Sequence, residues 1–173
     1  MLRSDISKLW QSVAGDIAPL AHVLRADLNN RWVRFHSLPD SIRYADTNEQ
    51  RNLILDRHNE ILHSIWNAGD PIVILTTREG LQFNEGIDSH WRALSGNAII
   101  EFNEYRWEKG VLNAMILGAA DEELWSCMVI NVISSDIYHP YDGGLDLFLA
   151  KADRIPEMKQ IFEKYLSHHP DGL

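Results

Sequence analysis

Along the first 36 residues, apolar positions are spaced as in two short helices followed by a strand. Helical spacing covers Ile6–Val13 and Pro19–Leu28, and Arg31–His36 then alternates between the two faces of an extended chain. This alternation places Val33 and Phe35 together on one face of the predicted strand. The opposite face would carry Trp32, Arg34 and His36.

The clearest helical pattern runs from Asn48 to about Ala68. Thr47 and Gln50 have the spacing of a capping box, in which side chains at a helix start satisfy exposed backbone N–H groups. Gly69 is a typical helix end. The apolar stripe of this helix consists of Ile54, Ile61, Leu62 and Ile65.

After this helix, strand patterns dominate. The run Pro71–Thr77 is short, apolar and β-branched, as buried strands are. Further on, two strands are predicted at Ile99–Trp107 and Leu124–Ile133, with a helix at Gly110–Ala120 between them. A hairpin is predicted from 136–141 and 145–149 around Asp142-Gly143, a turn-forming dipeptide, and an amphipathic helix at Asp153–Ser167 closes the chain. The apolar positions of residues 80–96 have neither helical nor strand spacing.

These elements predict a single α/β domain of the α+β kind over residues 1–173, with helices packed on a mixed sheet of about five strands. A chain of 173 residues with 45% hydrophobic residues is long enough to bury its own core. Its one cysteine excludes an internal disulfide. Because Cys127 lies in an apolar run, we expect a buried thiol rather than a nucleophile.

No apolar segment follows the first residues as it would in a signal peptide, and the longest uncharged runs are 110–120 and 124–135. A membrane helix needs about 20 apolar residues. The sequence therefore predicts a cytoplasmic protein that does not associate with membranes.

The net charge of −9 is unevenly distributed. Residues 1–78 carry nine basic and nine acidic residues, whereas residues 79–173 carry seven basic and sixteen acidic residues. An acidic half disfavours nucleic acid and favours a basic protein partner, whose binding should weaken with salt and with neutralisation of the exposed acids. The alternative is that the acidic surface serves solubility alone. Neutralising Glu101, Glu104, Glu122 and Glu123 together should slow binding to such a basic partner.

The run His139-Pro140-Tyr141-Asp142-Gly143-Gly144-Leu145-Asp146 concentrates the chemistry of the chain. It is either a structural turn or a binding site. As a turn, Asp142 would cap it, the glycines would adopt backbone angles closed to other residues, and Asp146 would be solvated. As a site, it predicts binding through His36, His139, Tyr141, Asp142, Gly143, Gly144 and Asp146.

No catalytic, cofactor or metal motif is complete. His58 falls on the stripe of the long helix and is either a core histidine or a ligand or base. His58 and His63 are five residues apart, so they diverge on a helix and do not form a zinc pair. The sequence predicts no cofactor and no stoichiometric zinc.

Several segments resemble a bacterial family that carries a domain of unknown function. They are Arg34-Phe35-His36-Ser37-Leu38-Pro39 with Arg43-Tyr44, Arg57-His58-Asn59, Ala119-Ala120-Asp121, His139 to Asp146, and Leu166 to Leu173. The resemblance spans the chain from Arg31 onward and leaves the helical segment 1–28 uncovered. Some members of the family are associated with Rhs-type toxin elements, whose neighbours include immunity proteins, and this association implies a toxin as the partner.

The sequence leaves two specific functions open, beside a housekeeping or regulatory role that it does not define. The first is an acidic, immunity-like protein that binds and blocks a toxin. The alternative is a hydrolase-type enzyme with a site around His36, His139, Asp142 and Asp146.

Overall fold

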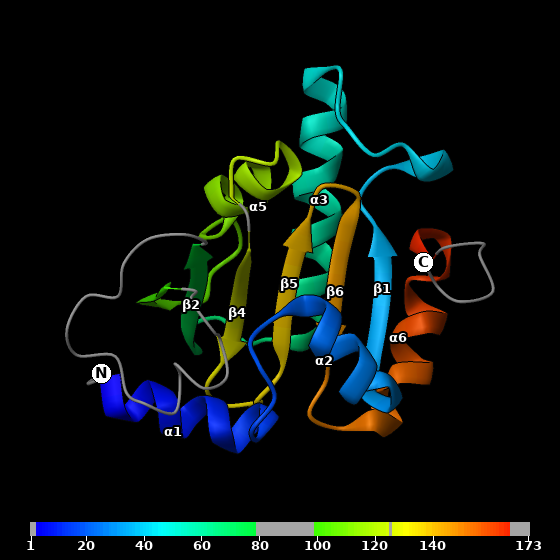
Figure 1. Cartoon of the computed structure of the whole chain (residues 1–173). Helices are drawn as coiled ribbons and strands as arrows, with labels where there is room; N and C mark the ends of the chain where they lie inside the picture. The colour runs from blue at the N-terminus through cyan, green and yellow to red at the C-terminus, as the bar shows by residue number, and fades with distance from the viewer. Residues whose placement is uncertain (1–2, 79–98, 125, 167–173) are drawn as a thin grey trace.

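The computed structural model describes residues 3–78, 99–124 and 126–166, and its centre is one sheet (Figure 1). The sheet has six strands in the order β1-β6-β5-β4-β2-β3, and each pairing is antiparallel. In chain order the strands are β1 (Trp32–His36), β2 (Pro71–Arg78), β3 (Ile99–Arg106), β4 (Cys127–Asn131), β5 (Ile137–Tyr141) and β6 (Gly144–Phe148).

Helices cover both faces of this sheet (Figure 1). α1 (Arg3–Ala14) and α2 (Ala21–Asp27) lie on one face, which we call the front face. α3 (Asn48–Ile65), α5 (Asn113–Ala120) and α6 (Ile155–Ile161) pack on the other, the rear face. Short 3₁₀ turns stand at Asn29–Arg31, Pro39–Ser41, Ala152–Arg154 and Glu163–Tyr165.

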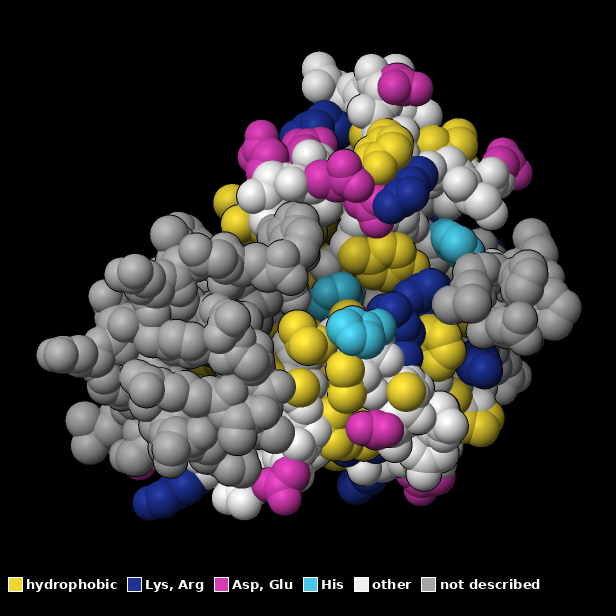
Figure 2. All heavy atoms as spheres, in the orientation of Figure 1, with side chains coloured by type: hydrophobic (Ala, Val, Ile, Leu, Met, Phe, Trp, Pro, Cys, Tyr) yellow, Lys and Arg dark blue, Asp and Glu magenta, His cyan; other side chains and the backbone are white. Residues whose placement is uncertain are grey.

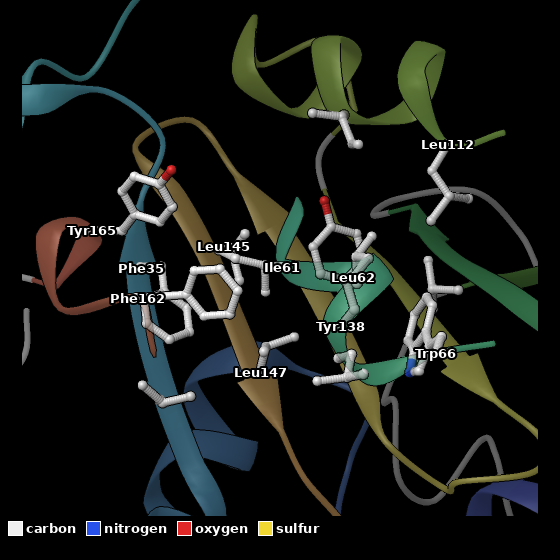
Figure 3. Close-up of a cluster of buried hydrophobic side chains, with 14 of the residues drawn as sticks. Phe35, Ile61, Leu62, Trp66, Leu112, Tyr138, Leu145, Leu147, Phe162 and Tyr165 are labelled. Atoms are coloured by element: carbon white, nitrogen blue, oxygen red, sulfur yellow. The ribbon is translucent and has the colours of Figure 1, made fainter. Parts of the chain in front are cut away.

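The larger hydrophobic core fills the rear face (Figure 3). Leu145 and Leu147 of β6 point into it together with Phe35 of β1, and α3 contributes Ile61 and Leu62. All five side chains are at most 1% exposed, so each removes nearly its whole apolar surface from water. The predicted alternation of the first strand and the inward direction of Leu145, Leu147 and Leu149 are both confirmed.

A second core lies under α1 and α2. Trp10 of α1 and Leu24 of α2 are fully buried against Val73, Ile130 and Phe148 of the sheet. The sheet therefore has apolar side chains on both faces, which explains the continuous burial along β4 and β6. The prediction of a buried thiol is also confirmed, since Cys127 is 1% exposed and burial raises its pKa to about 12.

The predicted fold class is confirmed, although the sheet differs from the prediction in strand direction and number. We expected a mixed sheet of about five strands, and the six described strands pair only antiparallel. The reason lies in the connections: β4, β5 and β6 follow one another through tight turns, which join antiparallel strands. The irregular segment at 80–96 lies outside the described residues. Within the described part of the chain, no helix combines the length and apolarity needed to cross a bilayer.

Most predicted elements are present, with shorter bounds. The capping box of α3 forms, with Gln50 N–H donating to Thr47 Oγ1 at 3.2 Å. α5 starts only at Asn113 because Gly110 has a φ of 94°, outside helical geometry. The closing helix is interrupted at Phe162, after which a 3₁₀ turn stacks the Tyr165 ring on Phe162 at 5.9 Å.

The two glycines of the β5–β6 turn are not required for the reason predicted. Neither Gly143 nor Gly144 has a left-handed φ, so the expectation of special backbone angles was wrong. Gly144 is instead required by close packing, because a Cβ there would lie 2.2 Å from the backbone oxygen of Phe35 on the paired strand. At Gly143 the nearest atom to a Cβ would be Cε2 of Tyr141 at 3.3 Å, which a small rotation relieves.

We therefore predict that Gly144→Ala destabilises the domain by about 2–3 kcal/mol, as overpacking against fixed backbone does. Gly143→Ala is the matched control and should cost about 0.5 kcal/mol or less, as at most surface positions. Urea denaturation of both variants measures the difference. Equal stability of the two would contradict the close-packing explanation.

Candidate functional site

The carboxylate of Asp146 is the centre of a polar cluster on the front face. Its side chain is 0% exposed and accepts hydrogen bonds from three residues. Arg34 donates through Nε at 2.9 Å and Nη2 at 3.2 Å. Trp32 Nε1 donates at 2.9 Å, and Arg25 Nη1 donates at 3.0 Å. The expectation of a solvated Asp146 was wrong, because residues distant in the sequence bury and neutralise it.

Strand pairing and helix placement create this cluster. Arg34 and Asp146 are directly opposite in the β1–β6 register, so both side chains point to the same face. Trp32 lies two residues before Arg34 on β1 and shares that face. Arg25 reaches the carboxylate from α2, which packs over this end of the sheet.

His139 and Tyr141 of β5 complete the cluster. His139 is opposite Asp146 in the β5–β6 register, and its Nδ1 lies 3.8 Å from Asp146 Oδ2. Its ring stacks on that of Tyr141 at 6.2 Å. Tyr141 in turn covers the Arg34 guanidinium, whose carbon lies 4.7 Å from the ring centre. The structure thus brings together His139, Tyr141 and Asp146 of the predicted site.

The electrostatics of the cluster favour a charged Arg34 and neutral rings. Burial alone would lower the pKa of Arg34, but the hydrogen bonds and charge of Asp146 more than offset it, so that pKa is raised. Burial lowers the pKa of His139 to about 4 despite the nearby Asp146. Burial also raises the pKa of Tyr141. At neutral pH the cluster therefore holds two guanidinium groups, one carboxylate and an uncharged imidazole.

Asp142 belongs to a different network, at the tip of the β5–β6 hairpin. Its carboxylate pairs with Arg43, and its Oδ2 lies 3.4 Å from Tyr44 Oη. The Tyr44 hydroxyl donates to Glu122 Oε1 at 2.9 Å. Asp142 and Asp146, both placed in the alternative hydrolase site, are therefore engaged by separate sets of partners.

Around this hairpin lies a concentration of carboxylates that we call the acidic tip. Asp121 pairs with Arg51 at 2.7 Å, and the next two residues follow the end of α5. Five of its six members are exposed, and Asp142 is half-buried. In Figure 2, magenta carboxylates gather with dark blue side chains at the upper end of the molecule. The acidic tip consists of Asp46, Glu49, Asp121, Glu122, Glu123 and Asp142.

The remaining predicted residues, His36, Gly143 and Gly144, stand where the β5–β6 turn packs against the end of β1. His36 ends β1 half-buried, directly opposite Gly144, and its backbone oxygen accepts from Arg57 Nη1 at 3.3 Å. Gly143 and Gly144 form the turn and its close contact with β1. Of the four acids expected to dock a basic partner, Glu122 and Glu123 belong to the acidic tip. Glu101 and Glu104 lie on the edge strand β3.

His58 is a core histidine with both ring nitrogens engaged. Ser37 Oγ lies 2.7 Å from Nε2, and Tyr138 Oη lies 2.6 Å from Nδ1. All three residues are at most 1% exposed, and burial lowers the pKa of His58 to about 3. Serine beside histidine is the pairing of a nucleophile and its base, but no substrate reaches this closed position. The three side chains therefore join β1, α3 and β5.

Sequence reasoning missed Arg25 and Trp32 as members of the Asp146 cluster. Arg25 reads as a solvated helix residue, and Trp32 as an ordinary apolar strand residue. The available signal was the charged position at Asp146 between Leu145 and Leu147, since a carboxylate inside an apolar run needs cationic partners. Among the residues that the structure describes, no three His, Cys, Asp or Glu side chains converge as metal ligands do.

We predict that Asp146→Asn lowers the unfolding free energy by about 2–4 kcal/mol. Loss of one partner from a buried ion pair costs roughly 3–5 kcal/mol. The cost here should be smaller because both arginines reach solvent. Asp142→Asn is the matched control, and it should change stability little because its partner Arg43 is 61% exposed. Chemical denaturation gives both values, and equal losses would contradict the assignment.

We also predict acid-sensitive stability. The folded-state pKa values of His58 and His139, about 3 and about 4, lie below the unfolded value, so only the unfolded chain takes up these protons at pH 5. Stability is then complete above about pH 6.5 and falls as the pH drops toward 4, by roughly 2 kcal/mol per histidine at pH 5. Urea unfolding at pH 7 and pH 5 measures this, and His139→Gln should remove about half of the difference. An unchanged difference in that variant would overturn the assignment for His139.

Comparison with known proteins places the chain in a family without giving it an activity. Neither the curated proteins nor the solved structures gave a significant match. A family model described as a domain of unknown function, DUF3885, matches residues 20–170. Its match covers most of the chain, including α2, the whole described sheet and the acidic tip, so the protein belongs to the DUF3885 family.

Proposed function

We propose that this protein binds a basic protein partner through the acidic tip and blocks it, as an immunity protein blocks a toxin. The observation that carries this proposal is the composition of the tip, in which six carboxylates of the described residues accompany two arginines, Arg43 and Arg51. Such a field speeds the encounter with a basic surface and selects against acidic ones.

Exposed side chains beside the carboxylates suit a protein interface. Tyr44 is 45% exposed and Ile42 is 37% exposed, and both precede α3 in the segment that contacts Asp142 and Glu122. Interfaces are enriched in tyrosine, which buries a large rigid ring and keeps a polar end for hydrogen bonding. The Tyr44 hydroxyl is already oriented by Glu122, so docking would immobilise few additional side-chain rotations.

Backbone strain is also concentrated near the tip. Within the described part of the chain, four non-glycine residues have positive φ. Three of these, Asp40, Ser41 and Glu122, stand in the segments that carry Arg43, Tyr44 and the acids after α5. Strained backbone persists where the surrounding structure over-determines it, and it is enriched at binding sites.

The polar groups of the front and rear faces support binding rather than hydrolysis. Asp146 has its oxygen atoms engaged by three donor residues, and a histidine with a pKa of about 4 is a weak base. The Ser37–His58 pair is buried. The choice of a toxin as the partner rests on the resemblance to proteins associated with Rhs-type elements.

The test uses the purified basic toxin domain encoded beside a gene for this protein. Its affinity, measured by calorimetry, should fall at least tenfold between 0.05 and 0.5 M salt, because screening at higher salt removes long-range attraction. Asp46→Asn, Glu122→Gln and Glu123→Gln combined should slow association by about tenfold.

The matched control carries the same charge change elsewhere. Asp153→Asn, Glu157→Gln and Glu163→Gln combined remove three exposed charges around α6. This control should bind at nearly the wild-type rate. Absence of binding, or equal effects of the two triple variants, would refute docking through the acidic tip.

A further inference from the structure

We propose that Arg25 and Arg34 form a binding site for a small oxyanion, the phosphate or carboxylate group of a small molecule. This site goes beyond the function proposed above and includes none of the six carboxylates of the acidic tip. It lies on the front face, where α2 meets β1, β5 and β6. Figure 2 shows dark blue and cyan side chains reaching the surface near the middle of this face.

Both arginine side chains keep N–H donors that form no hydrogen bond to Asp146. Arginine has five N–H donors, and Arg34 directs only Nε and Nη2 at Asp146, while Arg25 uses Nη1. The other N–H groups of both side chains make no hydrogen bond to the described residues. Asp146 therefore acts as a fixed support that holds two guanidinium groups side by side. Paired guanidinium groups recognise phosphate and carboxylate with high geometric specificity.

Arg25, Arg34 and Asp146 together carry one more positive charge than negative charge. Two guanidinium groups share one carboxylate, and the neighbouring His139 is neutral at pH 7, so one positive charge is left over. Asp142, whose charge also acts on Arg34, is paired with Arg43 at the hairpin tip. A surplus positive charge on a chain with a net charge of −9 is locally distinctive. A bound anion would neutralise it where water is partly excluded.

His139 has a buried ring nitrogen without a hydrogen-bond partner among the described residues. The side chain of His139 is 9% exposed, and its Nδ1 makes no hydrogen bond within the described part of the chain. This atom faces the cluster, 3.8 Å from Asp146 Oδ2, which is beyond hydrogen-bond distance. Such atoms are rare in folded proteins, and a ligand oxygen or its bridging water would satisfy this one.

The site is also rigid before any ligand arrives. Arg34 lies between two aromatic rings, with its guanidinium carbon 5.5 Å from the Trp32 ring centre and 4.7 Å from that of Tyr141. These contacts and the two hydrogen bonds to Asp146 fix its orientation, so binding costs little side-chain entropy.

The exposed part of the site fits one small group. Only 28% of the Arg25 side chain and 12% of the Arg34 side chain are exposed. This surface suits a single oxyanion rather than an extended polyanion. The acidic charge of the whole chain would in any case repel a nucleic-acid backbone.

Titration of the full chain with inorganic phosphate and, separately, with acetate tests the site, with chloride holding the ionic strength constant. Nitrogen-detected NMR should show saturable shifts of the Arg34 Nε and Trp32 Nε1 signals with one or both anions, and the tighter anion assigns the ligand class. Arg25→Gln should weaken binding at least tenfold. The control Arg106→Gln removes the same charge from an exposed side chain on β3, at the opposite edge of the sheet from β1, and should leave the affinity unchanged.

Shifts that never saturate would mean an adventitious ion only and would overturn the proposal. Equal affinity in Arg25→Gln, or an equal loss in Arg106→Gln, would overturn it as well. If Arg25→Gln fails to fold, Arg25→Lys keeps the charge that neutralises Asp146 and removes the planar fork, and it too should bind more weakly. Toxin binding through the acidic tip is measured separately, so either proposal can fail without the other.

Discussion

The neutralisation of Asp146 is the interaction on which the front of the molecule depends. A fully buried carboxylate costs several kcal/mol unless its oxygens are satisfied, and here Arg25, Trp32 and Arg34 satisfy them. These donors come from α2 and β1, while the carboxylate is on β6. The same contacts therefore fix the position of α2 on the sheet and the pairing of β1 with β6.

This interaction also divides the chemistry of the two faces. The rear face holds the larger apolar core, and its buried polar groups include the Ser37–His58–Tyr138 chain and Asn59, which donates to Asn113 Oδ1. The front face is apolar under α1 and polar beside α2. Among the described residues, the side chains for which we propose a ligand lie in the front cluster and in the loops at the acidic tip. The first offers surplus positive charge and the second negative charge.

Local patterns predicted the elements because their causes are local. The capping box of α3 and the alternation of β1 depend on residues within a few positions of one another. The Asp146 cluster depends instead on contacts across 112 to 121 residues of sequence, so spacing along the chain could not reveal it. The reason for Gly144 was equally hidden, since the atom that excludes a side chain there belongs to Phe35 of another strand. The hydrophobic period of the sequence predicts the face of the sheet on which a residue lies. The register of strand pairing determines which side chain of another strand lies opposite it.

The position of β1 in the sheet has a consequence for synthesis of the protein on the ribosome. Among the described strands β1 pairs with β6 alone, and Arg34 meets Asp146 only after a residue 112 positions later has been made. Until that point the nascent chain holds an apolar strand with no hydrogen-bonding neighbour, and loops of this length close slowly. The β2–β3 and β4–β5 pairs are available earlier. The newly made domain therefore passes through a period in which β1 can pair with other chains, and chaperones that shield such strands would determine its yield.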